Sequence, residues 1–279
     1  MSRHAARVDP EDRTRSEHLL AAGIAAGVTV ALAVAAALGR PALAAVLLLA
    51  QLALVAAWVV GTALPGRIGG LLIGAGAAVG VDAAVLVRPR SPLAGILGVL
   101  GLCMVALLVH QLSRGVIRVR VTESMSGVAA LCTAVAGLGG YLALQRAAEG
   151  DRLVSAAAVA AGLALVVGHL ADTVLPVPRF SDEVPHGVLG VGLAVAFGTL
   201  AGAAHALGVR QVDLAEGALL GALVGGTAAL VAVGVGYVAR TVEPRQVRFA
   251  QLAIPYLRVA LPLALTAPVA YLIGLYVTG

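Results

Sequence analysis

The chain consists largely of apolar runs, each about 20 residues long and separated by short polar links. A helix that crosses a membrane needs about 20 consecutive, mostly apolar residues. The sequence therefore predicts an all-α, polytopic integral membrane protein with about nine transmembrane helices. We expect the spans at residues 19–39, 42–64, 68–87, 92–112, 125–145, 153–174, 187–207, 214–239 and 250–277.

The composition supports the same fold class. Hydrophobic residues make up 60% of the 279-residue chain and charged residues only 12%, with a mean hydropathy of +1.00, whereas a soluble domain has about 25% charged residues. Residues 1–18 form a polar tail, and residues 19–279 are predicted to form one transmembrane helical domain. Because further spans follow the first apolar run, we interpret that run as a retained helix and not as a cleaved signal peptide.

The net charge of +5 comes from arginine, since the chain contains no lysine. Most of the arginines flank apolar runs, where they act as topology signals and contact anionic phospholipids, so nucleic acid is not an expected partner. Twelve arginines lie in the tail and the even-numbered links, and six lie in the odd-numbered links. This imbalance predicts a cytoplasmic N-terminus and an external C-terminus. We expect a multi-pass protein of a bacterial inner (cell) membrane.

Segment 168–187 carries the richest set of chemically active side chains. His169 and Asp172 are three residues apart, so they share one face of the sixth helix. Asp172, Asp182 and Glu183 supply the oxygen ligands that Mg²⁺ prefers if the loop folds back. The alternative is that the two loop acids are solvated and that Asp172 merely ends a helix. The same segment holds the remaining candidates of this cleft, Arg179 and His186.

A few isolated polar residues lie inside apolar runs. Arg258, in the ninth run, has a planar guanidinium that suits a lipid or nucleotide phosphate, or it extends to the membrane interface. Asp82, His110 and His205 are more typical of packing or interface residues.

Cys103 and Cys132 show no zinc or disulfide spacing. Glycines recur every four residues at 217, 221 and 225, which favours close packing between helices of the chain.

The sixth run ends in Asp172-Thr173, and a polar loop from Ser181 to Gly187 follows. Two further spans, a polar loop and a closing span that reads LTAPVAYLIGL complete the chain. In this order and spacing, the C-terminal half resembles the phosphatidate cytidylyltransferases (CDP-diacylglycerol synthases), membrane enzymes that join phosphatidate to CTP. The resemblance implies their fold and a cytoplasmic cleft between the loops that follow the sixth and eighth spans.

Several signature residues of that family are missing. Its loop lysines are absent, the eighth span ends in apolar VGVGYVAR where the family has acids, and the loop RTVEPRQVR lacks the family's closing acidic motif. Of the residues that hold catalytic magnesium in the family, only Asp172 carries over. The resemblance therefore implies a relative without that activity.

The sequence supports three functional hypotheses. The first is a cytidylyltransferase-like protein that binds a lipid or a partner at the cytoplasmic cleft. The second is a divergent transferase of lipid headgroups or nucleotides, with Asp172, Asp182 and Glu183 on the metal and Arg179 or Arg258 on phosphate. The third is a small-solute transporter that uses Asp82 together with His169 and Asp172 as polar groups within the membrane. The sequence indicates neither a substrate nor an oligomeric state.

Overall fold

The computed structural model describes residues 10–87, 91–114, 120–175, 177–180, 186–208, 212–241 and 248–278. These residues form nine α-helices and no named strand. All nine are long and apolar enough to cross a membrane, which confirms the predicted all-α fold of a multi-pass membrane protein. The helices are α1 (Pro10–Leu38), α2 (Arg40–Gly61), α3 (Arg67–Val87), α4 (Pro92–Ser113), α5 (Val121–Leu144), α6 (Gly150–Val174), α7 (Val188–Ala206), α8 (Leu214–Thr241) and α9 (Arg248–Thr278).

Most helix ends lie within a few residues of the expected spans, but α1 begins at Pro10 and not at residue 19. Proline is favoured in the first turn of a helix, because its fixed φ suits the helix and its missing N–H would have no partner there. The second half of the polar tail is therefore part of α1. This difference brings His18, which belongs to the predicted polar tail, into the bundle.

Short links reverse the chain between neighbouring helices. Gly39 separates α1 from α2 with φ of 105°, a backbone conformation that glycine adopts without steric cost. Pro41 follows in the first turn of α2. Gly39 ends α1 and Pro41 favours the start of α2, so a single residue separates the two helices.

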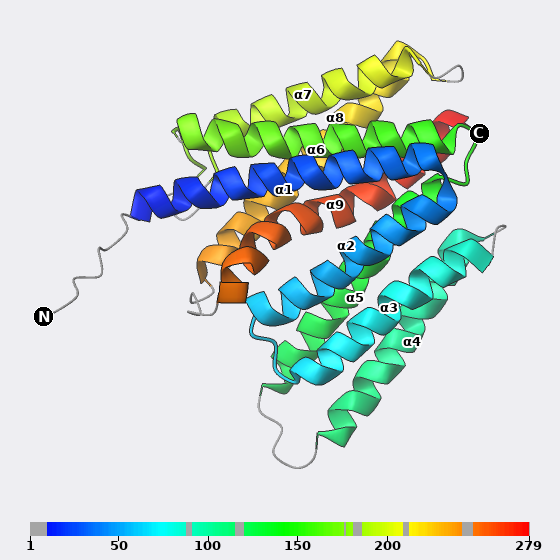
Figure 1. Ribbon diagram of the computed structural model, residues 1–279, viewed down its shortest axis with the longest axis vertical. Coiled ribbons are helices and arrows are strands. Elements are labelled where there is room, and N and C mark those ends of the chain that lie inside the picture. The colour runs from blue at the N-terminus through cyan, green and yellow to red at the C-terminus, as the bar shows by residue number, and fades with distance from the viewer. Residues whose placement is uncertain are drawn as a thin grey trace, which may run out of the picture.

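Two groups of helices meet on α9 (Figure 1). In the first group α6 contacts α1, α7 and α8, and in the second group α3 and α5 contact each other and also α2 and α4. The last helix lies between them and contacts members of both: α1, α2, α5, α6 and α8. The most buried helices are α5 and α6, whereas large apolar side chains of α4 such as Leu97, Leu102 and Val105 face outward. An apolar outer surface of this kind suits a lipid bilayer.

Glycines of α7 and α8 allow these two helices to approach closely. A methyl group added to Gly221 would overlap the carbonyl oxygen of Gly198, and one added to Gly202 would overlap that of Gly217. The expectation that the glycines at 217, 221 and 225 pack against another helix of the chain is confirmed, because each faces α7.

Replacing Gly221 by alanine should lower the thermal stability of the detergent-solubilised protein. The added methyl group would force two backbones apart, and overpacking of this kind costs about 1–3 kcal/mol. The matched control is Gly192→Ala on α7, where a Cβ atom meets nothing within 4 Å. Equal melting temperatures for the two variants would show that the close approach does not limit stability.

Candidate functional site

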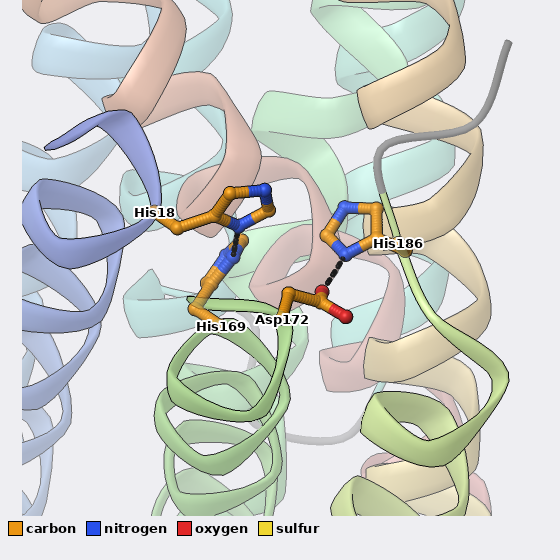
Figure 2. Close-up of side chains that lie close together, drawn as sticks. All are labelled: His18, His169, Asp172 and His186. Carbon is orange, nitrogen blue, oxygen red and sulfur yellow. Dashed lines mark hydrogen bonds and ion pairs between the residues drawn. The ribbon is translucent and has the colours of Figure 1, made fainter. Parts of the chain in front are cut away.

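Three histidines and one aspartate gather at one end of the first helix group. His18 lies in α1, His169 and Asp172 lie in the last turns of α6, and His186 immediately precedes the N-cap residue of α7. Figure 2 shows the four side chains turned toward one another. All four are buried, with exposed fractions between 1% and 5%. We call these residues the histidine cluster.

The local sequence explains how α6 contributes two members. His169 and Asp172 are separated by three residues, so they project from the same helix face, as predicted. The small residue Gly190 on α7 leaves room for Asp172, because a Cβ atom at that position would lie 2.7 Å from Asp172 Oδ1.

The described residues of the loop after α6 pair with the start of α7. Arg179 and Gly187 form an antiparallel bridge, and Val188 N donates to the Pro178 carbonyl at 2.9 Å. This pairing brings His186 against Asp172, whose Oδ2 lies 2.5 Å from His186 Nδ1. The other carboxylate oxygen, Oδ1, accepts the backbone N–H of Gly187 at 2.7 Å. Asp172 therefore fixes both the start of α7 and the orientation of the His186 ring.

The third histidine, His18, contacts the other members of the cluster because α1 packs along α6. Midway along the pair, Gly162 of α6 accommodates the side chain of Thr29. At the end of the pair, His18 Nδ1 lies 3.0 Å from His169 Nδ1, which is a hydrogen bond when one ring donates and the other accepts. The ring centroids of the three histidines are 5.3 to 5.5 Å apart, so the rings form a nearly equilateral triangle.

Two imidazole nitrogens of the cluster remain available for a ligand. His169 Nε2 and His186 Nε2 are buried and have no hydrogen-bond partner among the described residues. Both histidines and Asp172 line a small cavity of about 10 Å³ between α6, α7 and α8, which is the size that holds about one water molecule. A buried polar atom usually has a hydrogen-bond partner, so these two nitrogens are candidates to bind a water molecule or an ion.

An ion pair supports α1 beside the cluster. Arg258 of α9 is only 4% exposed, and its Nη2 lies 3.1 Å from the carboxylate of Glu17, the residue before His18. The structure thus places Arg258 inside the protein, in contact with α1.

Other candidates from the sequence lie elsewhere. Arg179 is exposed on the loop after α6, and Asp182 and Glu183 lie outside the described residues. Of the three acids expected to hold magnesium, the structure therefore describes only Asp172. Asp82, which the transporter hypothesis grouped with His169, lies on α3, and the described parts of α3 and α6 do not touch.

His18 is the member of the cluster that the sequence analysis missed. It occupies a polar stretch that reads as a tail, and its partner is 151 positions away in the sequence. One local signal was present: Pro10 begins a stretch without glycine that continues into the first apolar run, which is consistent with a helix that starts before that run.

No protein-family model matches the chain, and no curated protein or solved structure matches it either. The functional assignment therefore rests on the residues of the histidine cluster and on their position in a multi-pass membrane protein.

Proposed function

We propose that the protein is a membrane-embedded metalloprotein that binds a divalent transition metal of the zinc type at the histidine cluster. One observation carries this proposal. His18, His169, Asp172 and His186 are all buried, and each offers a ligand atom within 4.8 Å of those of the other three.

The donor set decides which metal fits. Three imidazoles are a typical zinc ligand set, and zinc takes four ligands in a tetrahedral arrangement, with water in the fourth position of such a site. Magnesium and calcium require shells made mainly of oxygen, and the described residues of the cluster provide a single carboxylate. The magnesium expected from the sequence is therefore a poor match for this group of residues, and zinc is a good one.

The contact between Asp172 and His186 fits the same function. A carboxylate that accepts the proton of one ring nitrogen holds a metal-binding histidine in place and raises its basicity. Asp172 lies against Nδ1 of His186, and Nε2 of that ring is the buried nitrogen without a partner among the described residues. In this arrangement the three imidazoles bind the metal, and Asp172 positions His186.

A bound ion would connect segments that are distant in the sequence. His18 belongs to α1, whereas His169 and His186 stand at the end of α6 and immediately before the N-cap of α7. A ligand that binds only the folded state stabilises it by about 2.7 kcal/mol at 100 times its dissociation constant. The metal would therefore clamp α1 onto α6 and the loop that precedes α7.

The test is metal binding by protein purified without a polyhistidine tag. We expect about one zinc ion per chain, and the double variant His169→Ala/His186→Ala should bind at least about 100-fold more weakly, because loss of even a supporting partner costs 10–100-fold. His205→Ala is the matched control, since His205 lies on α7 and bonds the Ala201 carbonyl outside the cluster. Circular dichroism confirms that each variant is folded.

Equal zinc binding by the native protein and the double variant would contradict the proposal. Equal loss of binding in His205→Ala would contradict it as well, because the zinc would then bind elsewhere. Substitution by cobalt(II) adds a spectroscopic check, since a tetrahedral site rich in imidazole gives a visible absorption band that the double variant should lack.

A second candidate function is binding of an anionic phospholipid, as the resemblance to cytidylyltransferases suggests. It is favoured by the backbone N–H of Gly187, which bonds Asp172, the residue that carries over, because Gly187 also pairs with the exposed Arg179. The thermal shift with phosphatidate should exceed that with phosphatidylcholine, and Arg179→Ala should reduce the difference. Equal shifts with both lipids would reject this candidate. Formation of CDP-diacylglycerol from CTP and phosphatidate would show instead that a transferase activity is retained.

A further part of the proposal is a bacterial inner membrane as the location, with a cytoplasmic N-terminus, and the arginine distribution supports this orientation. In that orientation the histidine cluster faces the cytoplasm. Single cysteines at two exposed serines test it, with Cys103 and Cys132 replaced by alanine. An impermeant thiol reagent added outside should label Ser91→Cys, after α3, and spare Ser113→Cys, at the end of α4. The reverse pattern would invert the topology.

A further inference from the structure

A second buried polar pair lies in the other group of helices. Asp82, on α3, and Gln51, on α2, have exposed fractions of 5% and 0%. Within the described residues, α3 contacts α2, α4 and α5 but neither α1 nor α6. The pair is therefore separate from the histidine cluster, and its chemistry does not depend on metal binding there.

The hydrogen bonds of this pair leave two acceptors without a donor. Gln51 Nε2 donates to Asp82 Oδ1 and to the Val135 carbonyl of α5, each at 3.2 Å. These two bonds use both protons of the amide. Gln51 Oε1 and Asp82 Oδ2 are buried, and neither has a hydrogen-bond partner among the residues that the structure describes.

No described cation pairs with Asp82. Arg146, which follows α5, donates to the carbonyls of Val85 and Leu86 and so caps the end of α3.

The helices packed on α3 carry their charged or titratable polar groups near their ends, namely Arg40 of α2, His110 of α4 and Glu123 of α5. Nearer the centre, α4 and α5 contribute the buried thiols of Cys103 and Cys132, and α5 also contributes the hydroxyl of Tyr141, which bonds Thr266.

This environment selects a particular ligand. An ionised carboxylate without a cation is costly inside a membrane. A hard metal ion takes about six oxygen ligands, whereas two oxygens remain here. A single proton on Asp82 removes the charge and also supplies the missing donor, because a protonated carboxyl has one O–H.

We propose that Asp82 and Gln51 form an intramembrane proton-binding site, in which Asp82 is a neutral carboxylic acid at pH 7. Gln51 binds the carboxyl through Oδ1 and holds it against α5. The proton is the ligand, and Asp82 is the group that takes it up and releases it. The protein thereby has a second ligand site, at a different place in the bundle from the proposed metal site.

Infrared spectroscopy of the purified protein in lipid tests this assignment. A protonated carboxyl has a C=O stretching band well separated from the bands of carboxylates and amides. At pH 7 we expect this band in the native protein and a loss of its Asp82 component in Asp82→Asn. Asp151→Asn is the matched control, because Asp151 is exposed in the first turn of α6 and the band should persist.

Two further measurements keep the test decisive if Asp82→Asn folds poorly. Asp82→Glu retains an acid and should shift the band without removing it. Labelling native aspartates with ¹³C should move the band to lower frequency, which identifies an aspartic acid without any substitution. Identical spectra for the native protein and Asp82→Asn, or a band that the aspartate label leaves unmoved, would overturn the proposal.

Discussion

The scarcity of water inside a membrane is the constraint on which the rest of this structure depends. A polar atom in that environment needs a partner within the protein, because an unsatisfied group costs several kcal/mol. The chain meets this constraint mainly by forming helices, whose backbone groups bond one another. Its few interior polar side chains then gather in pairs and clusters: Gln51 with Asp82, Tyr141 with Thr266, and the histidines with Asp172.

Small residues allow the helices to pack closely enough for these polar side chains to make contact. Lipid tails are as apolar as leucine, so helices in a membrane associate by close van der Waals contact, for which glycine and alanine are suited. Gly162 allows α1 to lie along α6, and Gly190 leaves space for the carboxylate of Asp172. The same small residues that bring the backbones together therefore also bring His18 to His169 and Asp172 to the start of α7.

The two polar sites satisfy the constraint in different ways. In the histidine cluster both oxygens of Asp172 have hydrogen-bond partners, whereas Nε2 of His169 and Nε2 of His186 have none among the described residues, which suits a metal ion. In the Asp82–Gln51 pair the atoms without partners are acceptor oxygens, and these suit a proton. The ligand proposed for each site therefore follows from the type of buried atom, nitrogen or oxygen, that has no hydrogen-bond partner among the described residues.

The sequence by itself determined the fold class, the nine spans and the shared face of His169 and Asp172, because hydrophobic length and helical periodicity are local properties. It also singled out His186 and Arg258 as candidates. The tertiary structure alone decided that His18 joins them and that Asp82 stands apart on α3. The reason is that contacts between α1 and α6 depend on how helices far apart in the chain pack, and helical periodicity carries no information on which helices become neighbours.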